Sequence, residues 1–118
     1  MNKLGIIGEK IAIRYLKRHG YKIFETNFRV KCGELDIIAK RGEYICFIEV
    51  KTRSSSVFAQ PFEGVDYFKQ IKLKKCAEIW LCMHGLSDVL CRFDVVSILL
   101  EKNGSLEEIR LFQDAFWT

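Results

Sequence analysis

The sequence lacks several features that would place it in particular classes of protein. No stretch of its 118 residues is apolar over the roughly 20 residues that a membrane-spanning helix needs. The N-terminus has one lysine and reaches Glu9 and Lys10 too soon for a signal peptide. There are no repeats, and there is only one proline, Pro61. We therefore expect a single domain over residues 1–118 that does not contact membranes.

The five cysteines form no C-x-x-C pair, which argues against a redox motif or a zinc ribbon. Their number is odd, and several lie within apolar patterns, where cysteine acts as a small hydrophobic side chain. This usage fits a reducing cytoplasm better than secretion. We expect a cytoplasmic protein with free thiols.

The overall composition is that of a globular domain with a modest excess of positive charge. Hydrophobic residues make up 49% and charged residues 29%, enough apolar material for one core. The 19 lysines and arginines exceed the 15 acidic residues, for a formal net charge of +4. This balance mildly favours an anionic partner such as a nucleic acid.

The most informative stretch is residues 33–53, GELDIIAKRGEYICFIEVKTR. Two apolar runs, 37–39 and 45–48, predict strands buried on both faces, joined by a tight turn at Arg41-Gly42. Buried charge is costly unless something compensates it, so acids beside such strands need a reason. The charged residues in question are Glu34, Asp36, Glu49 and Lys51.

Strand geometry predicts that these four charged residues gather on one face. Side chains alternate along a strand, so Glu49 and Lys51 share a face. A two-residue turn at Arg41-Gly42 would place Asp36 opposite Phe47 and Glu34 opposite Glu49. A three-residue turn would break the cluster, so the prediction depends on the register.

Residues 4–18 have the periodicity of a helix with a basic arc. Lys10, Arg14 and Lys17 belong to this arc, whereas Glu9 falls on the side that should face the protein. Two interpretations of Glu9 remain open. It forms a salt bridge or a backbone hydrogen bond, or it is a third acidic group of the strand cluster.

The remaining elements complete an α/β pattern. Strands are expected at residues 21–29, 91–100 and 106–112, a loop at 53–62, and a long helix at 62–83. The face of this helix expected to be buried carries Val65, Phe68, Cys76, Ile79, Trp80 and Met83. The helix buries mainly its C-terminal half, and Lys69 and Lys72 point inward from its N-terminal half. They either bury their stems, or bind phosphate or the acids. The order predicts a sandwich around a mixed central sheet of about five strands, flanked by helices.

The acidic cluster has the composition of a magnesium site. Mg²⁺ binds through one or two carboxylates together with substrate phosphates and water. Asp36 and Glu49 would be the ligands, with the Val50 carbonyl as an extra one, and Mn²⁺ is the alternative ion. Lys51 would orient a metal-bound water or stabilise the developing charge. A purely structural ion network is the alternative.

The pattern Asp36…Glu49-x-Lys51, with Glu9 on the first helix, resembles the PD-(D/E)XK nuclease superfamily, and most closely its Holliday-junction resolvases. Nearly the whole chain resembles the small bacterial YraN-like family. The stretches that carry this second resemblance are Gly8-Glu9, GELDIIA, FIEVKTR, Val65…Lys69-Gln70, RFDVV and DAFW.

The resemblance implies a restriction-endonuclease-like fold and catalytic positions at Glu9, Asp36, Glu49 and Lys51. Two departures are Leu35-Asp36 in place of proline-aspartate, and Ala59-Gln60 where the family tends to have a glycine. The expected activity is Mg²⁺-dependent hydrolysis of DNA, including branched or structured DNA. A non-catalytic nucleic-acid-binding or adaptor domain is the alternative, and a homodimer is left open.

The basic residues expected to contact nucleic acid lie on both predicted helices and after the Glu49 strand. Binding through phosphates should weaken steeply as salt is added. The residues are Lys10, Arg14, Arg53, Lys69 and Lys72.

Overall fold

The computed structural model describes residues 3–55 and 65–116 as two helices and one five-stranded sheet. In the described residues every strand is hydrogen-bonded to its neighbour in sequence order, and only the β3–β4 pair is parallel. This confirms the α/β class and the mixed sheet. The elements are α1 (Lys3–Arg18), β1 (Lys22–Val30), β2 (Gly33–Arg41), β3 (Tyr44–Ser54), α2 (Tyr67–Met83), β4 (Cys91–Leu100) and β5 (Leu106–Phe116).

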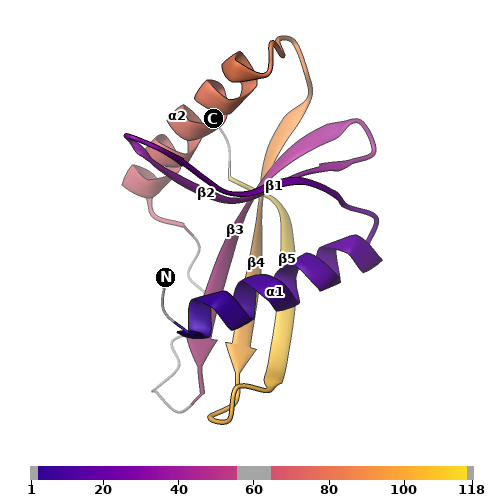
Figure 1. Cartoon of the computed structure of the whole chain (residues 1–118), viewed down its shortest axis with the longest axis vertical. Helices are drawn as coiled ribbons and strands as arrows, with labels where there is room; N and C mark the ends of the chain where they lie inside the picture. The colour runs from indigo at the N-terminus through magenta and orange to yellow at the C-terminus, as the bar shows by residue number, and fades with distance from the viewer. Residues whose placement is uncertain (1–2, 56–64, 117–118) are drawn as a thin grey trace.

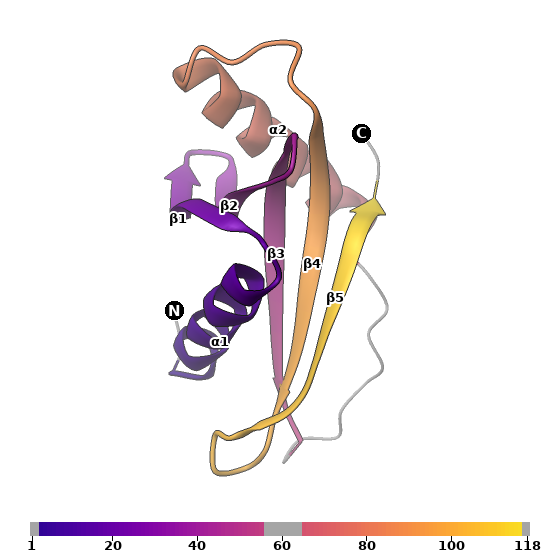
Figure 2. The ribbon, with the colours of Figure 1, turned by 90° about the vertical axis from the view of Figure 1, so that its right-hand side faces the viewer.

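The two helices pack on opposite faces of the sheet. Figure 1 shows α1 across the lower part of the long strands and α2 at the upper part. Strands β3, β4 and β5 run side by side, while β1 and β2 turn across them (Figure 2). The core therefore has two parts. Phe47 and Trp80 belong to the α2 side, and Ile48 and Leu16 belong to the α1 side.

The continuous apolar run in β3 follows from this arrangement. Ile45 and Phe47 face α2, whereas Cys46 and Ile48 face the α1 side, and all four are buried. A strand covered on both faces has no position for a polar side chain unless that side chain has a partner. The prediction of buried strands at residues 37–39 and 45–48 is confirmed.

The turn between β2 and β3 lies one residue later than predicted. Gly42 and Glu43 form it, and Gly42 has φ of 61°, which glycine adopts without strain. The ladder pairs Arg41 with Tyr44 and Ile37 with Ile48, so one further step sets Asp36 opposite Glu49 instead of Phe47. The pairing partners shift by two residues, and an even shift keeps every side chain on its predicted face.

Helix α2 buries only part of the predicted stripe. Its buried residues are Leu73, Cys76, Ala77 and Trp80, at helical spacing on one face. Phe68, which was expected on the buried face, is 75% exposed, and Ile79 and Met83 are exposed as well. Asp66 caps α2 by accepting a hydrogen bond from the Lys69 N–H, so the described helix starts later than residue 62.

Other boundaries also moved. β3 extends through Arg53 to Ser54, and β5 continues four residues beyond Phe112 to Phe116. Most of the loop predicted at 53–62, including Ala59-Gln60 and Pro61, lies outside the described residues. Neither α1 nor α2 is long and apolar enough to cross a membrane.

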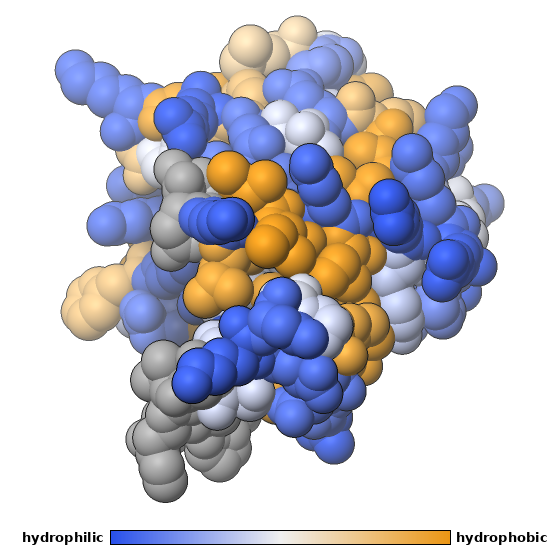
Figure 3. All heavy atoms as spheres, turned by 60° about the horizontal axis from the view of Figure 1, so that its bottom comes forward, coloured by the Kyte–Doolittle hydropathy of each residue, from blue (hydrophilic) through white to orange (hydrophobic). Residues whose placement is uncertain are grey.

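Helix α1 leaves part of its sheet face accessible. Ile7 of α1 and Ile109 and Leu111 of β5 are only partly buried against the α1-side core. Ile6 is 44% exposed. Figure 3 shows apolar surface between hydrophilic side chains on the lower face of the molecule.

Close approach of α1 to β3 depends on Gly8. A β-carbon at this position would clash with the Thr52 side chain. We expect Gly8→Ala to lower the free energy of unfolding by about 1–3 kcal/mol, because the helix must move off the strand. Urea unfolding would measure this change in stability. Gly104→Ala would not serve as a control, because Gly104 has a φ of 90°, which alanine rarely adopts. A matched control is Lys10→Ala at an exposed position of the same helix, and equal stability of both variants would contradict the prediction.

Candidate active site

Three elements bring charged side chains to one open pocket of about 530 Å³ between the sheet and the first turns of α2. Asp36 comes from β2, Glu49 from β3, and Lys69 from α2. The helices cover much of both faces of the sheet, and these charged side chains lie at the end of the α2 face that opens to the pocket. The pocket is lined by Gly33, Glu34, Asp36, Glu49, Asp66, Phe68, Lys69, Lys72, Leu73 and Cys76.

Asp36 is held at the point where β2 and β3 separate. Its Oδ2 atom accepts a hydrogen bond of 2.8 Å from the Val50 N–H. Burial raises the pKa of Asp36 to about 7, and the neighbouring Glu49 carboxylate adds to the effect. Asp36 therefore carries only part of a negative charge at neutral pH.

Glu49 has a direct partner on α2. Its side chain is buried, and the Lys69 Nζ atom lies 2.9 Å from the Glu49 Oε1 atom. Burial alone would lower the pKa of Lys69, but the hydrogen bond and the charge of Glu49 raise it. Of the two interpretations of Lys69, pairing with the acids is the one seen in this structure.

Lys51 lies on the same face as Glu49 and is half-buried. Burial lowers the pKa of its amine, and repulsion from Lys69 lowers it further, against the attraction of Glu49. A lysine amine with a lowered pKa releases its proton more readily than an exposed one, so Lys51 suits a role in proton transfer as well as in charge stabilisation.

Glu9 reaches the edge of the site through an intermediary that the sequence pattern did not reveal. Asn27 of β1 donates hydrogen bonds from Nδ2 to Glu9 Oε2 at 3.0 Å and to Glu34 Oε1 at 3.2 Å. Asn27 has φ of 54°, a conformation that asparagine tolerates better than most residues. Glu9 is half-buried and does not line the pocket. Its role as a metal ligand stays a prediction.

The predicted nucleic-acid contacts fall on separate surfaces. Lys10 and Arg14 are exposed on α1, and Lys72 is exposed at the pocket. Arg53, on the same strand as Lys51, is half-buried, and its Nε atom has no hydrogen-bond acceptor among the described residues. Asp66 also lines the pocket, and sequence reasoning missed it because the helix was expected to begin earlier, at residue 62.

The carboxylates fit a divalent cation whose remaining ligands come from the substrate. Within residues 3–55 and 65–116, no three or more His, Cys, Asp or Glu side chains form a group that could hold a metal ion. Asp36 and Glu49 are the two carboxylates that could hold one, which is the number Mg²⁺ uses when substrate phosphates supply the rest. Burial and the charge of Glu49 raise the pKa of Asp36, and a bound cation would oppose both effects.

The pKa of Asp36 predicts a specific dependence of stability on pH. The carboxyl group has a higher pKa in the folded state, about 7, than its ordinary value of 3.8. Between these values the folded state retains a proton that the unfolded state has lost, so metal-free stability should fall as pH rises through this range. Asp36→Asn should lack this part of the slope. Urea unfolding across pH would measure it, and identical slopes for the two proteins would contradict the prediction.

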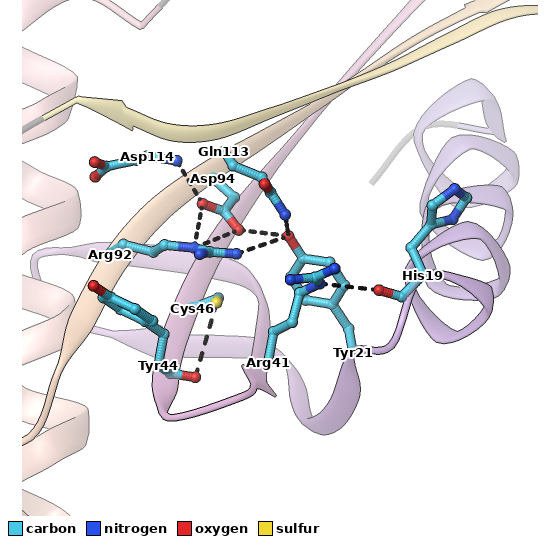
Figure 4. Close-up of polar contacts among 9 residues, drawn as sticks. All are labelled: His19, Tyr21, Arg41, Tyr44, Cys46, Arg92, Asp94, Gln113 and Asp114. Carbon is cyan, nitrogen blue, oxygen red and sulfur yellow. Dashed lines mark hydrogen bonds and ion pairs between the residues drawn. The ribbon is translucent and has the colours of Figure 1, made fainter.

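A second polar cluster is buried on the α1 side of the sheet, away from the pocket (Figure 4). Asp94 of β4 is 0% exposed and accepts hydrogen bonds from the Tyr21 hydroxyl, the Arg92 Nε atom and the Asp114 N–H. The Tyr21 oxygen also accepts from Gln113. Burial raises the pKa of Tyr21 to about 12. Asp94 and Arg92 form an ion pair at 3.1 Å.

The fold and pocket define a class: a small α/β domain with a five-stranded mixed sheet between helices, consistent with the restriction-endonuclease-like architecture. Residues 8–98 match the model of the family described as "Uncharacterised protein family UPF0102". The chain belongs to the UPF0102 family, the YraN-like family that its motifs resemble.

Several bacterial relatives support this membership. A UPF0102 protein of Acetivibrio thermocellus is 45% identical over 116 residues, covering 95% of this chain and 89% of the relative. One from Caldicellulosiruptor bescii is 44% identical, with 98% of each chain covered. One from Geotalea uraniireducens is 48% identical over 113 residues, covering 96% of this chain and 88% of the relative.

Proposed function

We propose that this protein is a divalent-metal-dependent nuclease that hydrolyses phosphodiester bonds in DNA, with Mg²⁺ or Mn²⁺ as the ion. The observation that carries the proposal is the meeting of Asp36 and Glu49 in an open pocket that also contains Lys69 and Lys72. We place the chain in the PD-(D/E)XK superfamily on the same residues, with branched or structured DNA as the first substrates to test.

In this proposal the carboxylates hold the cation and the lysines bind the phosphate. Asp36 and Glu49 would hold the cation, which when bound lowers the pKa of a coordinated water and offsets charge on the phosphate. The Val50 N–H fixes one Asp36 oxygen and so orients the carboxylate. Lys69 and Lys72 lie on the pocket wall and supply positive charge for phosphate oxygens. The Val50 carbonyl and Glu9 are proposed as further ligands.

Basic residues outside the pocket provide a surface for the rest of the nucleic acid. Lys10 and Arg14 are exposed along α1, and Arg53 continues the strand that carries Lys51. Contacts of this kind add affinity without reading sequence, and each neutralised phosphate makes binding more sensitive to salt.

One observation favours a second candidate function. The Lys69–Glu49 ion pair already offsets the charge of Glu49 without any metal. An arrangement of this kind also serves a non-catalytic nucleic-acid-binding or adaptor domain that uses the acids only to hold α2 on the sheet. Such a protein would bind DNA and leave it intact.

A cleavage panel separates the two functions. The substrates are single-stranded, duplex, flapped and four-way-junction DNA, each with Mg²⁺, with Mn²⁺ and with a chelator. We expect cleavage of at least one substrate with metal and none with chelator. Salt-sensitive binding of DNA without cleavage under any condition would support the adaptor instead.

Lys51 gives a test that separates catalysis from metal binding. Lys51→Met keeps the apolar stem and removes the amine, so cleavage should fall by about two orders of magnitude while the affinity for Mn²⁺ stays nearly unchanged. Calorimetric titration of Mn²⁺ beside the cleavage assay would measure both. Lys75→Met, at an exposed position on α2, is the control, and full activity of Lys51→Met would remove Lys51 from the mechanism.

A further inference from the structure

A group of basic side chains gathers where the end of α1 meets the end of the β1–β2 pair, away from the pocket residues. We call this group the basic corner, and all of its members are exposed. It is defined by Lys17, Arg18, Lys22, Lys40 and Arg41.

Two contacts of Arg41 and one pair of lysines define how these residues are arranged around the end of the β1–β2 pair. The Arg41 Nε atom donates a hydrogen bond of 3.0 Å to the His19 carbonyl, which joins the end of β2 to the end of α1. The Arg41 guanidinium also lies over the ring of Tyr21, 5.6 Å from its centre (Figure 4). Lys22 pairs directly with Lys40 across the β1–β2 ladder. Side chains alternate along β2, so Lys22 and Lys40 project to the α2 side of the sheet while Arg41 projects to the α1 side, and the basic corner surrounds the end of the strand pair.

The corner has an uncompensated charge. None of the ion pairs among the described residues includes any of its five members. The nearby carboxylate of Asp94 is buried and engaged by Arg92. Like charges directly opposite on neighbouring strands destabilise a sheet, so the Lys22–Lys40 pair costs folding free energy without a visible return.

The ordinary explanation covers only part of the group. Lys17 and Arg18 occupy the last turn of α1, where cations interact favourably with the helix dipole. Lys22 and Lys40 lie on strands and gain nothing from that dipole. Arg41 uses its Nε atom for His19, and none of the described residues accepts a hydrogen bond from its terminal amino groups.

We infer that the basic corner is a second phosphate-binding surface, which holds the backbone of the nucleic acid at a distance from the carboxylates. This inference rests on the proposed function for the kind of ligand. Lys40 is four residues along β2 from Asp36, about 13 Å at ~3.3 Å per residue. At ~3.4 Å per base-pair step, this separation corresponds to about four steps of a duplex.

The test compares two double variants on two lengths of DNA. Lys22→Gln/Lys40→Gln removes the corner lysines, and Lys75→Gln/Lys102→Gln removes the same charge from exposed positions elsewhere. Binding to a duplex hairpin of about four base pairs and a duplex of about 20 base pairs would be measured by fluorescence anisotropy. A chelator throughout prevents cleavage, and urea unfolding checks that each variant is folded.

The corner variant should bind the long duplex more weakly than the control variant, with a salt slope smaller by about 2. Its affinity for the short hairpin should match that of the control. It should also be at least as stable as the parent protein, because a like-charge pair is gone.

Three results would overturn the inference, and they differ in what they say about the proposed function. Equal binding of the long duplex by both variants rejects the corner and leaves the nuclease proposal standing. Equal losses on the short and long DNA assign the lysines to the pocket's own ligand. Failure of the parent protein to bind either DNA at low salt rejects the corner together with the proposed function.

Discussion

Asp36→Asn and Glu49→Gln should each abolish metal-dependent cleavage in a protein that remains folded. Both substitutions keep the shape of the side chain and remove the negative charge that would hold the cation. The rate should fall by about two to three orders of magnitude or more, since the charge on the phosphate then develops without compensation. Cleavage of the preferred DNA substrate with Mg²⁺ and with Mn²⁺ would measure the loss.

The stability of the two variants should differ, which adds a readout independent of activity. Asp36→Asn removes one of two close like charges and should raise metal-free stability above pH 7. Glu49→Gln leaves the Lys69 ammonium beside a neutral amide and should lower stability. Asp66→Asn is a matched control. Asp66 also lines the pocket, but its carboxylate caps α2 and is not proposed to bind the cation. Large destabilisation by both test substitutions, with no cleavage by the parent protein on any DNA, would leave a structural ion network.

Asp94→Ala should destabilise the protein by about 3–5 kcal/mol, the largest stability effect that we expect of any single substitution. Asp94 is fully buried, and its two oxygens accept from Arg92, Tyr21 and the Asp114 N–H. The register of β4 and β5 shifts between Phe93 and Val95, where Asp114 has φ of 53°. Without the carboxylate, this bulge loses an acceptor and Arg92 is left with an uncompensated charge.

Urea unfolding would measure the effect of Asp94→Ala against Glu107→Ala, a substitution of an exposed acid on β5 that should change stability by less than about 0.5 kcal/mol. Asp94→Asn tests the mechanism, because it retains an acceptor but loses the charge that balances Arg92. It should fall between the parent protein and Asp94→Ala. A loss below about 1 kcal/mol for Asp94→Ala would mean that water or a rearranged Arg92 replaces the carboxylate.

Local patterns predicted the strands and the face on which the charged residues gather. Alternation in β3 placed Glu49 and Lys51 together, and the two-residue turn placed Asp36 with them although the turn itself lies one residue later. Moving the turn by one residue shifts the pairing partners by two residues, and an even shift keeps each side chain on the same face of the sheet. The α2 stripe was only partly right, because Cys76 and Trp80 are buried but the apolar side chains of Phe68 and Met83 are exposed.

Contacts between distant residues left no local trace. Tyr21 and Asp94 are 73 positions apart, and Tyr21 and Gln113 are 92 apart, so no periodicity links them. Asn27 bridges Glu9 and Glu34 only because its backbone adopts a positive φ. Lys69 could be expected to point inward, but only the packing of α2 decides that it meets Glu49 instead of water. These contacts depend on how the elements pack in three dimensions, which spacing along the sequence does not reveal.

The single parallel pair in the sheet has a consequence for how the chain folds. The antiparallel pairs β1–β2, β2–β3 and β4–β5 join neighbours in sequence and close short loops, whereas β3–β4 pairing brings Ile45 to Cys91 across the whole α2 segment. Long-range parallel pairing forms slowly, because the entropy of closing the loop is lost before the contacts form. We therefore expect an N-terminal meander and a C-terminal hairpin to form first and to join late along the β3–β4 seam. Glu49 lies on that seam, but the residues that line the pocket come from β2, β3 and α2 and the residues just before α2, all before β4, so formation of the pocket does not require the seam to close first.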